Sequence, residues 1–127
     1  MDVEEFFESM PFARLLGVEV TEAADGHAEG EVDVTQELSW HSEEVKAHGG
    51  VTFTLADTVG GAALVSLNDQ PVPTVDMRID YLSAGTGDLY AEADVVRNGS
   101  DVGVVDVAVY DEDDEHLADA RGVYKTG

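Results

Sequence analysis

Apolar residues recur with regular spacing along most of the chain, and the period of that spacing changes from segment to segment. The apolar positions between residues 3 and 10 follow helical spacing, which predicts a short N-terminal helix. A second short helical piece is predicted from Phe12 to Leu16, because Pro11 precedes it and Gly17 ends it. These two pieces are expected to be packing elements.

Two segments of alternating apolar and polar residues come next, at Val18–Ala23 and His27–Val34. Alternation of this kind predicts strands with one buried and one solvated face, and Asp25-Gly26 between them suits a tight hairpin. Four later segments also predict strands, and we expect antiparallel pairing because their connections are too short for crossovers. These strands span Thr74–Leu82, Leu89–Arg97, Val102–Tyr110 and Leu117–Tyr124, with turns at Gly85–Gly87, Asn98–Gly99 and Asp111–Glu115.

The stretch from residue 51 to 67 has apolar or small side chains on nearly every side of a helix, so other elements must surround it. The order of elements predicts an α+β fold, in which one curved antiparallel sheet wraps around a single long central helix. The length suits one domain of residues 1–127. A sheet covers only part of such a helix, so we also expect self-association.

The charge balance is strongly acidic, with 28 acidic and 6 basic residues and a formal net charge of −22. Self-repulsion of this size destabilises a compact protein in dilute buffer, whereas about 1 M salt shortens the Debye length to about 3 Å. The composition therefore predicts a protein of a hypersaline cytoplasm. A disordered acidic protein is the competing interpretation, and the regular apolar pattern argues against it.

Several classes of function are disfavoured by composition. No basic stripe exists to bind nucleic acid or an anionic membrane, and the absence of cysteine excludes disulfides, thiolate metal sites and cysteine nucleophiles. The acidic N-terminus does not resemble a signal peptide, and no apolar run approaches the roughly 20 residues of a membrane span. His27, His41 and His116 lack paired-ligand spacing, so neither a metal site nor a cofactor is predicted.

The central helix carries the candidate chemistry. Asp57 is the only ionisable residue between Gly49 and Asn68, and a buried carboxylate is costly unless it is hydrogen-bonded or used. Gly49 and Gly50 place unhindered N–H groups at the helix N-terminus, where an oxyanion could bind. Structural alternatives remain open: capping or close packing for the glycines, a satisfied hydrogen bond for Asp57, and a structural role for His48.

The spacing within this helix has a consequence for assembly. Asp57 lies eight residues beyond Gly49, a rise of about 12 Å, which is too far for both to act on one carbonyl. Antiparallel packing of two such helices in a dimer could bring Gly49 of one chain near Asp57 of the other. Gly60 and Gly61 cost about 1 kcal/mol each relative to alanine, which predicts close helix approach across the dimer or room for an acyl or pantetheine chain.

The run His-Gly-Gly-Val-Thr-Phe-Thr-Leu-Ala-Asp at 48–57 is followed by Thr-Val-Asp-Met-Arg-Ile-Asp-Tyr-Leu-Ser at 74–83. Together they resemble the phenylacetate-pathway type of hotdog-fold acyl-CoA thioesterase, over nearly the whole chain from Leu15 to Gly122. The resemblance implies the hotdog fold, acyl-CoA as substrate and a homodimer that commonly forms a dimer of dimers.

The resemblance also implies roles for individual positions. Gly49 would donate its N–H to the thioester carbonyl, Asp57 of the facing subunit would be nucleophile or general base, and Thr74 would help position water. The segments Tyr81–Thr86 and Arg97–Ser100 resemble those that contact coenzyme A. The predicted catalytic set is Asp57, Gly49, His48, Thr74 and Ser42, and the predicted substrate contacts are Gly50, Asp76, Tyr81, Ser83, Arg97, Gly99 and Ser100.

Two positions depart from the family pattern. Ser42 stands six residues before His48, where relatives usually carry an asparagine or glutamine that polarises the carbonyl; Ser42, His41 or an ordered water could substitute. Ser100 stands where relatives often have a basic residue after the glycine of the Arg-x-Gly turn. Arg97, Arg121 or Lys125 could supply that charge.

The resulting hypothesis is an acyl-CoA thioesterase that releases free acid and CoA. A non-catalytic acyl-CoA binding or sensing module is the alternative; Ser42 favours it, whereas Asp57 and the glycine pair argue against it. A hotdog hydratase is a third interpretation, and the sequence offers no Asp and His pair placed for proton transfer to an enoyl thioester.

Overall fold

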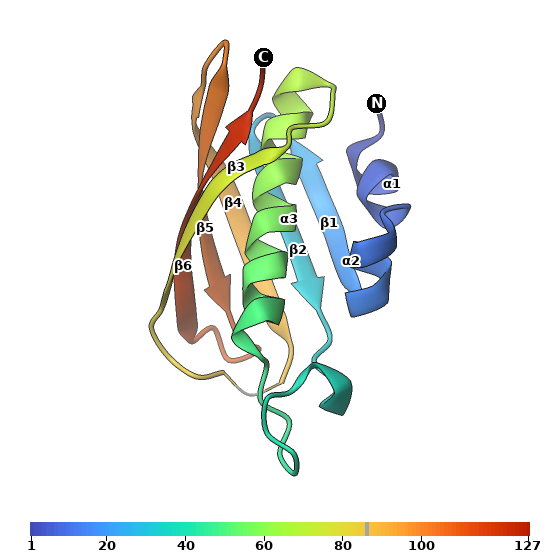
Figure 1. Cartoon of the computed structure of the whole chain (residues 1–127), viewed down its shortest axis with the longest axis vertical. Helices are drawn as coiled ribbons and strands as arrows, with labels where there is room; N and C mark the ends of the chain where they lie inside the picture. The colour runs from blue at the N-terminus through green and yellow to red at the C-terminus, as the bar shows by residue number, and fades with distance from the viewer. Residues whose placement is uncertain (86) are drawn as a thin grey trace.

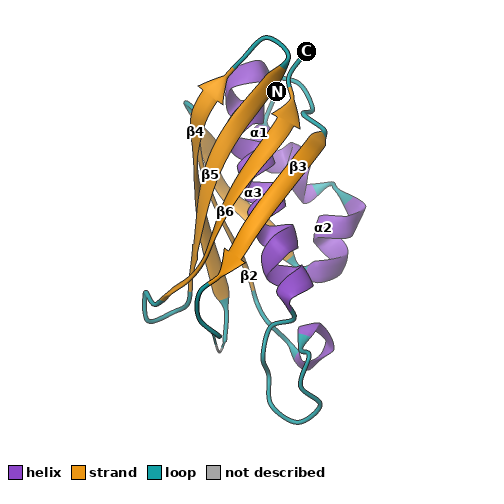
Figure 2. Ribbon diagram, turned by 60° about the vertical axis from the view of Figure 1, so that its left-hand side comes forward, coloured by secondary structure: helices purple, strands orange, loops and turns teal. Residues whose placement is uncertain are grey.

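The computed structural model describes residues 1–85 and 87–127, so Thr86 of the predicted 85–87 turn lies outside the described residues. A six-stranded antiparallel sheet curves around one long helix, with two short N-terminal helices beside it (Figures 1 and 2), which confirms the predicted hotdog arrangement. The elements are α1 (Val3–Glu8), α2 (Pro11–Leu16), β1 (Val18–Ala24), β2 (His27–Val32), the 3-10 turn η1 (Gln36–Leu38), α3 (Gly49–Asn68), β3 (Thr74–Tyr81), β4 (Leu89–Asn98), β5 (Val102–Tyr110) and β6 (His116–Lys125).

Local sequence explains where the first elements begin and end. The Asp2 carboxylate caps α1 by accepting the N–H of Glu5 at 3.0 Å. Gly17 ends α2 in the left-handed region, with φ of 80°. Asp25 and Gly26 both have positive φ, 54° and 81°, as the tight turn between β1 and β2 requires.

The strands are ordered β1-β2-β4-β5-β6-β3, and all pairs are antiparallel as expected. Adjacency along the chain does not predict every neighbour, because β3 pairs with β6 rather than with β4. This places β1 and β3 at the two edges of the sheet. An edge strand leaves a row of backbone groups without partners, so β3 is available for pairing.

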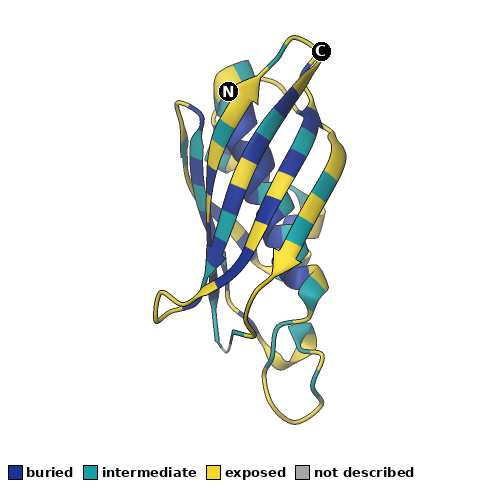
Figure 3. Ribbon diagram, turned by 90° about the vertical axis from the view of Figure 1, so that its left-hand side faces the viewer, coloured by how far each residue is buried: buried dark blue, intermediate teal, exposed yellow. Residues whose placement is uncertain are grey.

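The core lies between α3 and the concave face of the sheet. Along β4, β5 and β6 buried and exposed residues alternate (Figure 3), as the pleat requires when one face is covered. Leu55, Val59 and Leu64 of α3 are fully buried. In contrast, Phe53, Thr54, Asp57 and Thr58 are partly exposed and share one side of the helix, so this single protomer leaves a stripe of α3 uncovered.

The buried glycine pair of α3 serves a contact within the protomer. A Cβ on Gly60 would lie 2.5 Å from the hydroxyl oxygen of Tyr124, a residue of β6 that is only 1% exposed. A Cβ on Gly61 would meet the same ring at 3.5 Å. The expectation that these glycines admit a second helix or an acyl chain is therefore wrong, because the Tyr124 side chain already occupies that space.

The expectation that no apolar run approaches the length of a membrane span is wrong for α3, whose 20 residues are, by length and composition alone, apolar enough to cross a membrane. Most of it is buried against the sheet, however, and the core helix of a soluble protein passes the same test. We therefore interpret it as the core helix that the periodicity predicts.

Candidate active site

The first backbone N–H groups of α3 differ in whether they have a partner. His48 is the N-cap residue, and its Nδ1 accepts the N–H of Gly50 at 2.8 Å, while its carbonyl accepts the N–H of Val51 at 2.9 Å. Within residues 1–85 and 87–127, the N–H of Gly49 has no acceptor. The N–H of Gly49 can therefore donate to a ligand, whereas the N–H of Gly50 is already engaged.

The same end of α3 is tied to the end of β3. The Tyr81 hydroxyl donates to the carbonyl oxygen of Gly49 at 2.7 Å, across 32 residues of sequence. Gly49 and Tyr81 both line a mainly apolar cleft of about 380 Å³. The cleft is bounded by Trp40, Lys46, Ala47, Gly49, Thr52, Tyr81, Leu82, Ser83, Ala84, Gly85, Leu89 and Leu117.

Two strands hold Asp57 from the sheet side. The Thr74 hydroxyl donates to Oδ1 of Asp57 at 2.7 Å, and the Tyr124 hydroxyl donates to the backbone carbonyl of Asp57 at 2.8 Å. Thr74 and Tyr124 are themselves cross-strand partners in the β3–β6 ladder. A bulge between Thr74 and Asp76 then re-aims the strand, a feature often found next to active sites. The structure thus brings the predicted pair Asp57 and Thr74 together.

Tyr124 is a site residue that sequence reasoning missed. Burial, together with the nearby Asp57 carboxylate, raises the pKa of its phenol far above the ordinary value, so the hydroxyl stays protonated and remains a donor. The signal in the sequence was Gly60, since a glycine inside a buried helix requires a reason. Only the pairing of β6 with β3 shows that the reason is this tyrosine.

Asp57 differs in one respect from the expectation. It is partly exposed rather than buried, because it lies on the uncovered stripe of α3. Neither Asp57 nor Thr74 lines the cleft beside Gly49. Within one protomer the two halves of the predicted chemistry therefore stay apart, in agreement with the helical rise of about 12 Å between them.

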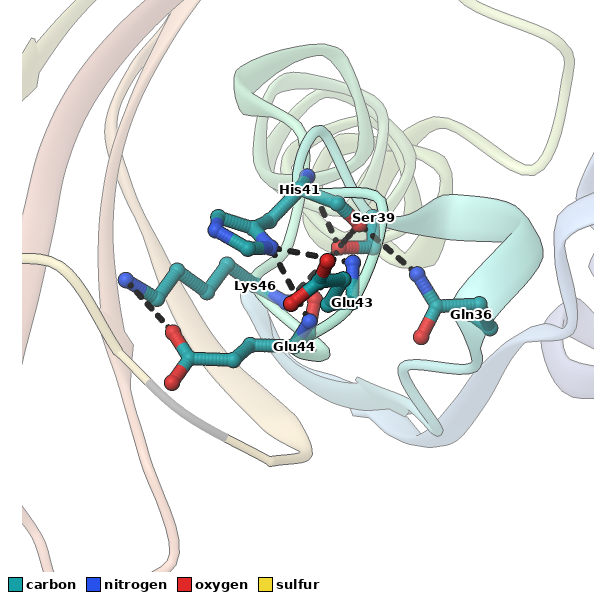
Figure 4. Close-up of polar contacts among 6 residues, drawn as sticks. All are labelled: Gln36, Ser39, His41, Glu43, Glu44 and Lys46. Carbon is teal, nitrogen blue, oxygen red and sulfur yellow. Dashed lines mark hydrogen bonds and ion pairs between the residues drawn. The ribbon is translucent and has the colours of Figure 1, made fainter.

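The loop before α3 is held by its own polar contacts (Figure 4). Ser39 Oγ accepts the N–H groups of His41 and Lys46, and His41 Nδ1 accepts those of Glu43 and Glu44 at 3.0 Å each. The Nδ1 atom of His41 is therefore occupied inside the loop. Ser42 is exposed and does not line the cleft.

The predicted coenzyme A contacts fall into two groups at opposite ends of the molecule. Tyr81 and Ser83 lie beside the N-terminus of α3, and the Ser83 hydroxyl donates to Glu115 at 2.9 Å. The turn containing Arg97, Gly99 and Ser100 lies at the other end, where Asn98 accepts a hydrogen bond from the last helical residue, Asn68.

Two further residues named as candidates for ligand contact lie on the sheet. Asp76 is exposed on the edge strand β3. Arg121 donates twice to Asp106, at 2.7 and 3.0 Å, which engages its guanidinium and lowers the pKa of that carboxyl. Arg121 is therefore a poorer source of charge for a phosphate than its sequence position indicates.

The structure also assembles an acidic cluster that histidine spacing did not predict. Cross-strand register places Glu22 opposite Glu29, and His27 opposite Asp94. His27 Nε2 lies 2.8 Å from Glu29 and its Nδ1 lies 2.8 Å from Asp94. The ligand atoms of Glu22, His27 and Glu29 lie within 4.8 Å of one another, the only such group in the described part of the chain. An imidazolium between carboxylates offsets their mutual repulsion.

Removal of the His27 charge should destabilise the protein in a pH-dependent way. Hydrogen bonds to Glu29 and Asp94 raise the pKa of His27 from 6.5 to about 9. Because the pKa of His27 is higher in the folded than in the unfolded protein, the protonated ring stabilises the folded state at pH values below 6.5. This contribution is lost as the pH rises from 6.5 to about 9. We expect His27→Gln to lower the thermal midpoint at about pH 6 and to match wild type at about pH 10.

His116→Gln is the matched control, because His116 pairs with one carboxylate, Asp119. Thermal melts of the three proteins in molar KCl measure the effect. Equal destabilisation by His27→Gln at both pH values would show that the ring contributes packing rather than charge.

Comparison with known proteins identifies the family of this chain. Residues 46–118, more than half of the chain, match the family model of the thioesterase superfamily. A candidate esterase of Halobacterium salinarum is 37% identical over 84% of this chain and 74% of its own length. The acyl-coenzyme A thioesterase PaaI of Escherichia coli is 33% identical over 91% of this chain and 82% of its own.

A solved structure shows the same fold. A thioesterase-superfamily protein of Shewanella oneidensis has a TM-score of 0.88 at 31% identity, covering 98% of this chain and 93% of its own. The stretch matched by the family model contains both Gly49 and Asp57. The protein is therefore a thioester hydrolase, and the chain belongs to the thioesterase superfamily.

Proposed function

We propose that this single domain of residues 1–127 hydrolyses an acyl-CoA thioester to a free acid and CoA, at a site shared between two subunits. The observation that carries the proposal is the N–H of Gly49, which has no acceptor among the described residues and lies at the N-terminus of α3 beside an apolar cleft. Such a donor stabilises the negative charge that develops on a thioester oxygen. The acyl-CoA substrate class is supported by the relative named acyl-coenzyme A thioesterase.

The proposed reaction uses Gly49 of one subunit and Asp57 of the other. The Gly49 N–H polarises the carbonyl, and Asp57 takes a proton from water as that water attacks the carbonyl carbon. The C–S bond then breaks, and the CoA sulfur receives the proton. Direct attack by Asp57, through an anhydride that water hydrolyses, is the second route. In either route Thr74 holds Oδ1, which leaves Oδ2 to act.

Two surfaces of the protomer support the dimer. Edge strand β3 exposes Val75 and Tyr81, Leu82 directly after it is exposed as well, and the outer backbone edge of β3 could pair with the same strand of a second copy. The uncovered stripe of α3 contains Phe53 and Asp57, which an antiparallel partner helix would cover. Assembly of two such dimers into a tetramer is part of the same proposal.

A binding module without turnover is the second candidate, and one observation favours it. Ser42, which replaces the usual amide, is exposed and lies outside the cleft lining, so it does not polarise a carbonyl beside Gly49 in this protomer. We favour hydrolysis because simple binding does not require a carboxylate fixed by Thr74.

Release of free thiol from a panel of acyl-CoAs, assayed in molar KCl, tests the two candidates. The salt matches the hypersaline cytoplasm that we infer from the net charge of −22. We expect saturable hydrolysis of at least one substrate, with kcat/KM on the order of 10⁴ M⁻¹s⁻¹. Tight binding of an acyl-CoA without thiol release would instead establish the binding module.

A further inference from the structure

We propose that Tyr81 is a positioning residue that holds the oxyanion donor, Gly49, in its working orientation. The inference rests on the proposed function, because it assigns Gly49 the role of binding the thioester oxygen. The sequence suggested that Tyr81 contacts substrate. The geometry points to a different use of its hydroxyl.

The peptide group between Gly49 and Gly50 is held at both of its polar atoms. Its carbonyl oxygen accepts from the Tyr81 hydroxyl at 2.7 Å, and its N–H donates to Nδ1 of His48 at 2.8 Å. These two contacts come from opposite sides of the chain, one from the sheet and one from the cap. The N–H of Gly49 belongs to the preceding peptide group, whose His48 carbonyl accepts the N–H of Val51 at 2.9 Å. The two groups meet at the Gly49 Cα, so a shift of the clamped group changes the backbone torsions that aim the Gly49 N–H.

Two adjacent glycines need such a clamp. Glycine has more backbone freedom than any other residue, and helix ends fray, so an unclamped Gly49 would sample several directions of its N–H. A donor stabilises the transition state only if its direction is fixed beforehand. A Cβ on Gly49 would lie 3.2 to 3.4 Å from Tyr81, which shows how closely the phenol packs on this residue.

Tyr81 is itself well anchored. It is the last residue of β3 and pairs with Ala118 of β6. The next two residues, Leu82 and Ser83, both donate their N–H groups to the carbonyl of Leu117, at 2.8 and 3.2 Å. Although Tyr81 is 54% exposed, partial burial of its phenol raises the pKa of that group, so the hydroxyl remains a donor throughout the neutral range. The sheet thus provides a fixed reference for the flexible end of the helix.

Tyr81→Phe tests the proposal, because it removes only the hydroxyl. We expect kcat to fall about tenfold, less than the loss of the donor itself would cause, while KM stays within about twofold. Tyr90→Phe is the matched control on β4 and should retain both constants; Tyr90 lies outside the cleft. An unchanged kcat in Tyr81→Phe, or a raised KM alone, would overturn the proposal, since the latter marks a residue that only binds substrate.

A second measurement does not depend on activity. Amide NMR of the unliganded protein should show shifted signals and faster hydrogen exchange at Gly49 and Gly50 in Tyr81→Phe, but not in Tyr90→Phe. Unperturbed glycine amides in Tyr81→Phe would reject the clamp. If wild type hydrolyses no acyl-CoA, the proposed function fails, and the amide signals still decide whether Tyr81 orders the helix end.

Discussion

Asp57→Asn should reduce kcat by about 10²- to 10⁴-fold while leaving the subunits assembled. The amide has the same shape, and its Oδ1 can still accept the hydrogen bond that Thr74 donates at 2.7 Å. It cannot take a proton from water or form an anhydride at neutral pH, so the chemical step is lost while the packing remains. Thiol release and size-exclusion chromatography, both in molar KCl, measure the two effects.

The matched control is Asp80→Asn, which removes an exposed carboxylate paired with Arg78. It should hydrolyse acyl-CoA at the wild-type rate. Near-normal turnover by Asp57→Asn would reject the assignment of Asp57 as base or nucleophile. A dissociated Asp57→Asn protein would mean that the carboxylate serves the interface instead.

Gly49→Pro should lower kcat by about 10²- to 10³-fold, the effect of losing one oxyanion donor, or about 2.7–4 kcal/mol. Proline has no N–H and is favoured at the first helical position. The preceding residue, His48, has extended backbone with φ of −61° and ψ of 139°, which suits the residue before a proline. The helix should therefore form normally without its free donor.

Gly49→Ala separates the lost donor from the added carbon. Alanine retains the N–H, but its Cβ would lie 3.2 Å from the Tyr81 hydroxyl oxygen. The hydroxyl must therefore move by a few tenths of an ångström. We expect alanine to retain most of the activity that proline loses, as measured by steady-state kinetics. Equal losses in both variants would indicate crowding and would argue against the oxyanion role.

The two inactive variants together test whether the site is shared. Random dimers refolded from equal amounts of Asp57→Asn and Gly49→Pro would be half heterodimers, each with one intact site of two, so about a quarter of wild-type activity should return. If Gly49 and Asp57 acted within one chain, every site would lack one group. No recovery from mixing would exclude the composite site.

Much of the fold was predictable from the sequence. The apolar period of α3, the Asp25-Gly26 turn and the alternation in β4, β5 and β6 are local signals, because a helix or strand side chain repeats on its own face. The pairing of β3 with β6 was not predictable in this way. No residue near β3 specifies a partner more than 30 residues away, so the pairing is visible only in the folded sheet.

The candidate site was likewise predictable from the sequence only in part. Gly49, Asp57 and Thr74 were named from motif and resemblance, and the contact between Asp57 and Thr74 follows from the packing of α3 on β3. Tyr124, which holds the Asp57 carbonyl, was missed because 67 residues separate the two in sequence. The cluster around His27 was missed because it depends on the register of the β1–β2 hairpin and on Asp94 of the distant strand β4. Ser42 was named by its position alone, and the loop leaves it exposed.

By itself, the sequence determined the order of the elements, the single carboxylate of α3 and the distance of about 12 Å that separates Asp57 from Gly49, because these depend on local geometry. Only the tertiary structure decided which groups hold those two residues: Thr74 and Tyr124 for Asp57, and His48 and Tyr81 for Gly49. The physical reason is that a hydrogen bond requires atoms within about 3 Å, and strand register sets that distance between segments far apart in the chain.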